Sequence, residues 1–296
     1  MKTGILVINK SENMTSHDVV AILRKKLNMK RIGHTGTLDP MATGVLPICI
    51  GNSTRISEYI MNQGKSYIAT LKFGESTTTY DSEGEITNIS DNVSFTSDEI
   101  NKVLKTFLGD ISQTPPIYSA IKVNGKKLYE YARDNEKIEI KSRKVTVYDI
   151  KLLEIKNEFA KIYINCSKGT YIRSIIHDLG IKLNSYAHMT ELIRTRVGHF
   201  DLENSIDISK IDSYSLEDLE NSLISINDAL YNFESIEVTK IIRDRLVNGQ
   251  RINIKDLINI KIPKDEEIKI ISENEFIGIA KINNNILKME KMLWQR

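Results

Sequence analysis

The sequence feature that most restricts the fold is a twelve-residue segment, Gly33 to Gly44, that contains three glycines and one proline. Glycine and proline at this density favour an irregular loop over a helix or a strand. An apolar stripe with helical spacing precedes the segment, and an apolar run at residues 45–50 follows it. The stripe consists of Val19, Val20, Leu23 and Leu27. We therefore expect a helix, an irregular loop and a buried strand in succession.

The rest of the chain mixes strands with helices. Ser16 is expected to cap the first helix, and Thr96 with Glu99 fits a capping box before a second helix that stops at Gly109. A third helix is expected over residues 170–183. Strands are predicted at residues 5–8, 66–73, 145–155 and 161–166. This order predicts an α+β (mixed α/β) catalytic domain.

Charge is unevenly distributed, although the net charge of the chain is only +2. Residues 201–237 contain ten acidic residues and one basic residue, whereas residues 120–147, 161–200 and 238–296 each carry an excess of four basic residues. Separated basic segments suit a partner with a phosphate backbone, and solvated surface charge explains them equally well. The acidic segment is expected to be a connector, partly helical around residues 216–230. After it, short strands of a compact β module are predicted at residues 268–271, 276–280 and 286–289.

Composition excludes several classes of protein. No apolar run reaches the roughly 18 residues of a membrane-spanning helix, and the short N-terminal apolar stretch indicates a buried strand instead of a signal peptide, so we expect the cytoplasm. The two cysteines, Cys49 and Cys166, are far apart, which argues against a disulfide framework or a zinc site. The histidines show no metal-ligand spacing, so no metal is expected. They are His17, His34, His177, His188 and His199.

Three polar residues lie in positions that suit chemistry. Asp39 precedes Pro40, which restricts it to an extended backbone, although a turn-capping aspartate would look the same. Arg173 is expected in the first turn of a helix, where the helix dipole disfavours a cation, so it needs either an anionic partner or exposure to solvent. Tyr67 lies near the start of a predicted strand, where a tyrosine usually packs in the core.

Taken together, these features resemble a known family. The loop from Gly33 to Gly44 is similar to the signature loop of the tRNA pseudouridine-55 synthase family (TruB type), and further motifs follow in the family's order over residues 4 to about 200. Those motifs are Lys65-Ser66-Tyr67, Tyr118-Ser119-Ala120, Gly125 to Arg133, and Cys166 to Arg173.

The resemblance implies a fold and an activity. Residues 1–237 would form a pseudouridine synthase catalytic domain on a mixed, largely antiparallel sheet with flanking helices, with a T-loop-binding insertion at 117–143 and the acidic connector at 201–237. Residues 238–296 fit a small β-barrel-like RNA-binding module called PUA, and a purely stabilising module is the alternative. The implied activity is that of an isomerase that converts uridine 55 in the T-loop of tRNA to pseudouridine by base flipping, without a cofactor.

The resemblance also implies roles for individual residues. Asp39 would be the catalytic nucleophile, and Arg173 its partner, whose charge should lower the pKa that burial raises. Tyr67 would stack on the flipped uracil and is a candidate acceptor of the C5 proton. The implied substrate-binding residues are Lys10, His34, Tyr171, Leu192, Lys122, Lys126, Lys127 and Arg133. Ser11 replaces the proline that commonly follows Lys10 in the family, which affects the local turn.

The implied partner is tRNA, bound through its T-arm, with the acceptor arm as a further contact of the C-terminal module. No membrane partner is expected, and the chain should be a monomer. The alternatives are a non-catalytic RNA-binding protein, because residues 33–36 fit the GxxG turn of KH domains, a tRNA-folding chaperone, or a synthase acting on rRNA or guide-RNA complexes. The sequence does not choose between attack at ribose C1′ and attack at uracil C6.

Overall fold

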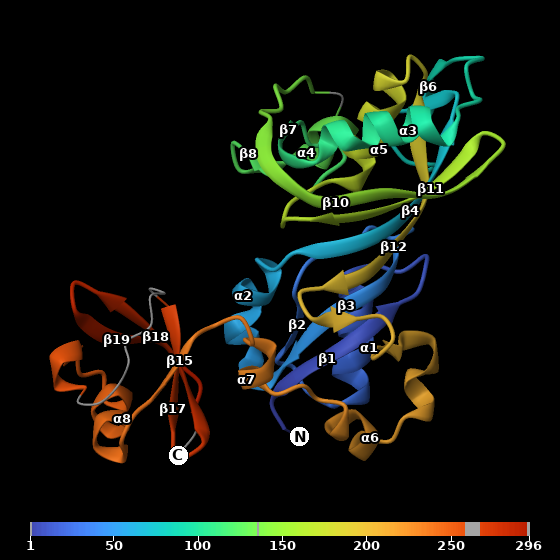
Figure 1. Ribbon diagram of the computed structural model, residues 1–296. Helices are drawn as coiled ribbons and strands as arrows, with labels where there is room; N and C mark the ends of the chain where they lie inside the picture. The colour runs from blue at the N-terminus through green and yellow to red at the C-terminus, as the bar shows by residue number, and fades with distance from the viewer. Residues whose placement is uncertain (1, 135, 258–266, 295–296) are drawn as a thin grey trace.

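The computed structural model describes residues 2–134, 136–257 and 267–294, in which two main β-sheets are surrounded by helices (Figure 1). The strands of the larger sheet are β1 Gly4–Lys10, β2 Ile32–His34, β3 Thr43–Ile50, β4 Lys65–Phe73, β7 Gly109–Gln113, β10 Arg143–Lys156, β11 Phe159–Cys166, β12 Ala187–Val197, β13 Phe200–Asp201 and β14 Ile206–Asp207. Eight of these follow one another in the order β14-β1-β3-β12-β4-β11-β10-β7, with β2 beside β3 and β13 beside β12.

Most neighbouring strands of this sheet are antiparallel, and only β1–β14 and β3–β12 pair in parallel among the described strands. The expected mixed, largely antiparallel sheet is therefore confirmed, together with all five predicted strands of its core region. Strand β12 was not predicted, although it lies at the centre between β3 and β4. Glu191, Arg194 and Arg196 interrupt its apolar pattern, which hides a strand from an analysis based on hydrophobic runs.

Four helices lie against the larger sheet. They are α1 Ser16–Lys26, α2 Ser57–Met61, α3 Ser97–Leu104 and α5 Ile172–Lys182, with 3-10 turns at η1 Gly51–Ile56 and η2 Lys105–Phe107. Helix α5 packs on β12 and β4, and α3 packs on β10 beside α5 in the upper half of the molecule (Figure 1). The capping box of Thr96 and Glu99 is confirmed. The expected cap at Ser16 was wrong, because Thr15 caps α1 and shares a capping box with Asp18.

Two small hairpins project from the upper half (Figure 1). One consists of β5 Glu75–Thr77 and β6 Ile86–Ile89, and the other of β8 Lys122–Val123 and β9 Lys126–Lys127. Asn124 and Gly125 form the turn of the second hairpin with positive φ angles of 51° and 85°, as a type I′ turn requires. Helix α4 Leu128–Arg133 follows directly. The segment 117–143 thus contains a hairpin and one short helix.

A second sheet contains the C-terminal strands. Its strand order is β15-β17-β18-β19-β16, and its elements are β15 Ser235–Glu237, α8 Lys240–Val247, β16 Ile252–Asn253, η4 Ile254–Asp256, β17 Glu267–Ser272, β18 Glu275–Asn283 and β19 Ile286–Met292. The three predicted strands are confirmed, whereas helix α8 was not predicted. The sheet also includes β15, which the sequence analysis assigns to the acidic connector. The connector otherwise holds η3 Ile208–Ser213, α6 Leu216–Asn221 and α7 Ile226–Ala229.

The two sheets share a hydrophobic contact. Ile279 and Leu293 of the C-terminal part belong to the same buried cluster as Ile5 and Val7 of β1. Nearby, Lys291 Nζ forms an ion pair with Glu58 Oε1 of α2 at 2.6 Å. The described residues contain no helix that is long and apolar enough to cross a membrane.

Candidate active site

The loop that carries Asp39 is attached to β1 through Lys10. Lys10 is fully buried, and its Nζ donates hydrogen bonds to the carbonyl oxygens of Ser11 (2.9 Å), Met14 (2.7 Å) and Pro40 (3.1 Å). Burial lowers the pKa of Lys10 to about 8. Because the three N–H groups of an ammonium each find a backbone acceptor here, Lys10 holds the chain immediately after Asp39.

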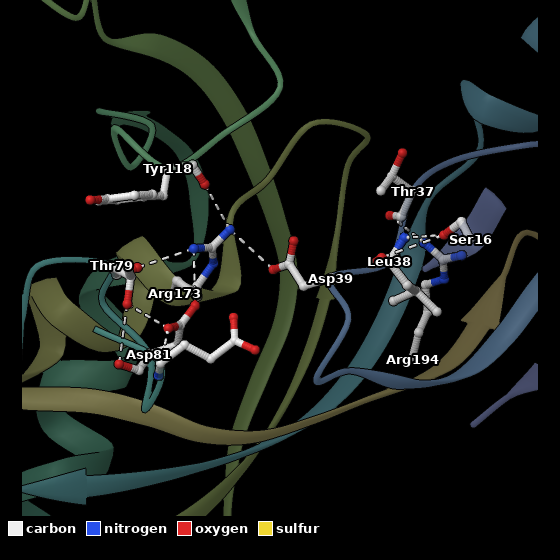
Figure 2. A network of polar contacts seen from close by, with 10 residues as sticks. Ser16, Thr37, Leu38, Asp39, Thr79, Asp81, Tyr118, Arg173 and Arg194 are labelled. Atoms are coloured by element: carbon white, nitrogen blue, oxygen red, sulfur yellow. Dashed lines mark hydrogen bonds and ion pairs between the residues drawn. The ribbon is translucent and has the colours of Figure 1, made fainter. Parts of the chain in front are cut away.

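Helix α1 holds the chain immediately before Asp39. The Leu38 amide donates to Ser16 Oγ at 2.9 Å, and Ser16 Oγ lies 3.4 Å from the Leu38 carbonyl oxygen. Both residues are buried. The backbone on each side of Asp39 is thus bonded to a neighbouring element, while its carboxylate points toward Arg173 (Figure 2).

Arg194 of β12 supports the same loop from the other side. It is 2% exposed, and its guanidinium donates to the carbonyl oxygens of Val45 (2.7 Å), Thr37 (3.4 Å) and Gly36 (3.2 Å). Strand β12 runs so close that a Cβ on Gly44 would lie 2.3 Å from the Arg194 carbonyl oxygen. Glycine at this position therefore allows β12 to approach the loop.

Arg173, in the first turn of α5, is the partner of Asp39. Its Nη2 lies 3.1 Å from the Asp39 carboxylate and donates to the Tyr118 carbonyl oxygen at 3.1 Å. Its Nη1 lies 3.0 Å from the Asp81 carboxylate and donates to the Thr79 carbonyl oxygen at 3.1 Å. The two terminal nitrogens of this arginine thus contact four oxygen atoms from four residues (Figure 2). The sequence left two alternatives for this cation, an anionic partner or exposure to solvent. The structure shows the first, because Arg173 is buried and faces two carboxylates.

The pKa of Asp39 is set by burial and by two neighbouring charged side chains. The Asp39 side chain is 36% exposed to solvent. The protein atoms around the carboxylate nevertheless displace enough water that burial raises its pKa. The Arg173 guanidinium lowers that pKa, and the Asp81 carboxylate raises it again. Arg173 thus opposes the effect of burial, as expected, although the net direction of the pKa shift is upward. The physical reason is that desolvation by burial is the largest contribution, and the nearby Asp81 carboxylate adds to it.

Tyr67 lies on β4 directly opposite Arg194 of β12. It is 9% exposed, and burial raises its pKa to about 12, while the Arg194 guanidinium beside it opposes the rise. Leu192 lies two residues before Arg194 and is 7% exposed. Because alternate residues of a strand share a face, Tyr67, Leu192 and Arg194 lie on the same face of the sheet.

Tyr171 precedes Arg173 and is held by its backbone. Gln113, 1% exposed at the end of β7, donates to the Tyr171 carbonyl oxygen at 2.9 Å and accepts from the Tyr171 amide at 2.8 Å. The Arg143 guanidinium lies 4.8 Å from the centre of the Tyr171 ring and donates to the Gly169 carbonyl oxygen at 2.7 Å. These contacts fix the start of α5, and with it Arg173.

His34 lies at the end of β2, half-buried and close to the loop. Its Nδ1 accepts a hydrogen bond of 3.4 Å from the Gly36 amide, and its ring packs edge-on against His17 with centroids 4.9 Å apart. Burial lowers the pKa of His34, so the ring is neutral at physiological pH. The structure thus shows a local hydrogen bond for His34, and its role in binding the substrate RNA stays a prediction.

The four cations of the segment 117–143 differ in how they are engaged. Lys122 is exposed on β8. Lys126 makes ion pairs with Asp134 (2.5 Å) and Glu136 (2.8 Å), which raise its pKa. An RNA phosphate would therefore have to compete with two carboxylates for Lys126.

Lys127 and Arg133 flank one aromatic ring. Lys127 Nζ donates to the Tyr129 hydroxyl at 3.1 Å, and the Arg133 guanidinium lies 5.3 Å from the centre of the same ring. Neither makes an ion pair with a carboxylate in the described part of the chain, so no acidic side chain there neutralises them directly. Lys127 and Arg133 thus differ from Lys126, because they contact an aromatic ring and Lys126 pairs with two carboxylates.

Three supporting residues were missed by the sequence analysis: Asp81, Gln113 and Arg194. Asp81 follows a run of threonines that resembles an ordinary turn, and Gln113 ends a short edge strand. Each is buried and acts on a residue that is distant along the chain, so no local pattern identifies them. Within the described residues, no group of three or more histidine, cysteine or acidic side chains is arranged to hold a metal ion.

Comparisons with known proteins agree with this geometry. Residues 24–172 match the family model described as TruB family pseudouridylate synthase, N-terminal domain, and residues 173–236 match the tRNA pseudouridylate synthase B C-terminal domain. The chain is 44% identical to tRNA pseudouridine synthase B of Clostridioides difficile over 97% of this chain and 98% of the relative. It is 45% identical to the enzyme of that name from Staphylococcus aureus strain MRSA252, over 93% and 92% respectively.

Solved structures share the fold. A chain in the crystal structure of a Cbf5-Nop10-Gar1 complex superposes with a TM-score of 0.76 at 26% identity, covering 99% of this chain and 85% of that chain. A chain of an H/ACA RNP bound to a substrate RNA containing 2′-deoxyuridine gives a TM-score of 0.74 at 24% identity, covering 99% and 86%. With two family models spanning most of its length and near full-length relatives above 40% identity, the chain belongs to the TruB family of tRNA pseudouridine synthases.

Proposed function

We propose that this protein isomerises uridine 55 in the T-loop of tRNA to pseudouridine, with Asp39 as the nucleophile. The observation that carries the proposal is the Asp39 carboxylate held 3.1 Å from a buried arginine, in a chain of the TruB family. Membership of that family establishes the reaction class, tRNA pseudouridine synthesis. The assignment of the individual residues rests on the geometry of the site.

The reaction exchanges one bond for another. The bond between uracil N1 and ribose C1′ breaks, the base turns within the pocket, and a bond forms between uracil C5 and C1′. The C5 proton leaves and N1 gains a proton, so the atoms balance without an oxidant, a reductant or a group donor. A carboxylate at C1′ or at uracil C6 supplies the temporary covalent bond, and Asp39 is the acidic residue presented by the loop.

The loop contacts suit such a nucleophile because they remove freedom from its backbone. Lys10, Ser16 and Arg194 each bond the loop on a different side, so Asp39 need not be ordered when RNA binds. We assign these three residues to positioning instead of contact with the RNA. Lys10, which the sequence resemblance placed among the substrate-binding residues, is therefore assigned to support of the loop.

The flipped base needs an aromatic or apolar surface. Tyr67 and Leu192 are assigned to that surface, because they share the sheet face that carries Arg194 below the loop. With a pKa of about 12, the Tyr67 phenol is protonated at neutral pH, so it can take the C5 proton only after passing its own proton to another base. We therefore assign stacking as its main role.

The segment 117–143 and the C-terminal sheet are assigned to RNA contacts outside the site. Lys127, Arg133 and Lys122 would bind T-arm phosphates, and Arg173 ties this segment to the site through the Tyr118 carbonyl oxygen. We further propose that residues 238–296 form a PUA-like module that contacts the acceptor arm, and that the enzyme acts as a cytoplasmic monomer.

The test is pseudouridine formation in an unmodified T-arm stem-loop, read by tritium release from 5-labelled uridine. Wild type should release tritium, and Asp39→Asn should lose at least about 10⁴-fold in rate, as removal of a nucleophile does, while binding of the RNA is kept. Asp110→Asn, an exposed carboxylate on β7, is the matched control and should keep full activity. No release by wild type on either the stem-loop or full-length tRNA would contradict the proposal.

A further inference from the structure

The turn that presents Asp81 to Arg173 contains a tyrosine in an unusual conformation. Tyr80 follows Thr79 and precedes Asp81, the two residues that accept the Nη1 hydrogen bonds of Arg173. Tyr80 has a φ of +63°, a left-handed conformation that a bulky side chain rarely adopts. Such a conformation persists only where the surrounding structure enforces it, so the contacts of the Tyr80 ring matter for its neighbours.

The Tyr80 ring stacks on His177. The ring centroids are 3.9 Å apart and the rings are inclined by 13°. His177 lies four residues after Arg173 in α5, so both side chains project from the same face of that helix. One helix thus contacts the turn twice, through the guanidinium at its start and through the imidazole one turn later.

The opposite side of the turn is bonded to β12. The Met189 amide donates to the Tyr80 carbonyl oxygen at 3.0 Å, and the Ser82 amide donates to the Met189 carbonyl oxygen at 2.9 Å. The backbone around Asp81 is therefore held by β12 on one side, while the ring of Tyr80 is held by α5 on the other. Loss of the ring contact would leave the turn attached to β12 and to the Arg173 guanidinium, without its second contact with α5.

The His177 imidazole contacts the turn through its ring face and not through a hydrogen bond. Its Nδ1 is buried, and no partner for it exists among the described residues. Burial lowers the pKa of His177, which keeps the ring neutral against the phenol. An aromatic ring without a polar atom should serve the same purpose, which separates stacking from proton transfer or charge.

We infer that the stack of His177 on Tyr80 is a positioning device that holds Thr79 and Asp81 against Arg173, and through Arg173 sets the placement of the Asp39 carboxylate. The inference rests on the proposed function of Asp39 and deepens it by naming two positioning residues outside direct contact with the reacting atoms. The path is continuous: Tyr80 to Asp81, Asp81 to Arg173 at 3.0 Å, and Arg173 to Asp39 at 3.1 Å.

The experiment measures the single-turnover rate of pseudouridine formation, the dissociation constant for the T-arm RNA and the melting temperature for three variants. His177→Ala should lower the rate about tenfold while the dissociation constant stays within about twofold, because misplacement of the catalytic group acts on the chemical step. His177→Phe keeps a ring for the stack and should regain most of the rate. Loss of rate in His177→Phe equal to that in His177→Ala would overturn the inference.

His199→Ala is the matched control. His199 is also half-buried with an unpartnered Nδ1, and it packs on Phe200 and Tyr231 with centroids 4.1 and 4.5 Å apart, away from the Arg173 contacts. It should lower the melting temperature about as much as His177→Ala does and leave the rate unchanged. A rate loss equal to that of His177→Ala would mean that general destabilisation explains both.

A double-mutant cycle tests the path. In an Asp81→Asn background, His177→Ala should reduce the rate by less than about twofold more, because the contact it supports is already weakened. A full additional tenfold loss in that background would overturn the proposed route through Asp81. If the wild type forms no pseudouridine, the proposed function fails by itself. The ¹⁵N signals of the Arg173 guanidinium then decide the inference: they should sharpen or shift in His177→Ala, and an unchanged spectrum would refute it.

Discussion

Asp39 lies between two buried arginines, Arg173 and Arg194, whose guanidinium groups have different kinds of partner (Figure 2). Arg173 is 6% exposed and faces two carboxylates. Arg194 is 2% exposed, donates to three backbone carbonyl oxygens and lies against the Tyr67 side chain, and it makes no ion pair with a carboxylate in the described part of the chain. A buried guanidinium needs acceptors for its donors, and either kind satisfies it. The kind of acceptor determines what each arginine affects. Arg173 contacts two carboxylates and therefore affects their charge, whereas Arg194 bonds carbonyl oxygens of the loop and therefore stabilises the conformation of that loop.

The largest expected effect comes from Arg173→Lys. An ammonium cannot reach the four acceptors that the planar guanidinium fork serves, so the Asp39 carboxylate loses its fixed partner. The single-turnover rate of pseudouridine formation should fall by about 10²–10³-fold, as for the loss of a fixed charge donor. RNA binding should be nearly unchanged. A loss of affinity with a normal rate would contradict this assignment of Arg173 and make it a substrate contact.

Arg194→Lys should act mainly on stability. Two of the three carbonyl oxygens that Arg194 serves would lose their donor inside the protein, which should lower the free energy of unfolding by about 2–4 kcal/mol. Urea denaturation measures this loss. The rate per folded molecule, corrected for the folded fraction, should fall much less than in Arg173→Lys. If the two variants show the same ratio of activity loss to stability loss, the contrast between the two arginines does not hold.

The charge coupling on the Arg173 side predicts a pH dependence. The reaction needs Asp39 as a carboxylate, and its pKa is raised, so the rate should be lost as the pH falls through a value above that of an ordinary aspartate. Asp81→Asn removes a negative charge that contributes to the rise. The acid limb of the pH–rate profile should therefore move to lower pH, even though the maximal rate falls. In Arg194→Lys the acid limb should move much less. A shift of the Asp81→Asn limb to higher pH would reverse the sign and disprove the coupling.

The smallest effect is expected in the segment 117–143, which joins the Arg173 side through the Tyr118 carbonyl oxygen. Lys127→Ala should weaken T-arm binding by a few-fold and reduce the slope of log affinity against log salt by about one, as for one lost phosphate contact. Lys126→Ala is the comparison, because two carboxylates already neutralise Lys126, and it should have the smaller effect. Filter binding at several salt concentrations would distinguish them. Equal slopes in both variants would mean that neither lysine contacts a phosphate selectively.

Local sequence patterns predicted much of the fold. The apolar runs of β1, β3, β4, β10 and β11 and the capping box of α3 were identified because each depends on neighbours in sequence. Strand β12 and helix α8 escaped, since charged residues interrupt their apolar pattern. The cap of α1 was misplaced by one residue because Thr15 and Ser16 are both good capping residues by type. In the structure Thr15 exchanges hydrogen bonds with Asp18, whereas Ser16 bonds Leu38.

The sequence by itself determined which residue types the site presents: an aspartate stiffened by Pro40 in a glycine-rich loop, a tyrosine at a strand start and an arginine at a helix start. Tertiary structure alone decided how those residues are held and charged. Asp81 and Arg173 are 92 positions apart, and Arg194 supports Thr37 from 157 positions away. The physical reason is that a buried charge is tolerated only where acceptors from other elements compensate its lost hydration, and no local pattern in the chain records where those acceptors will be.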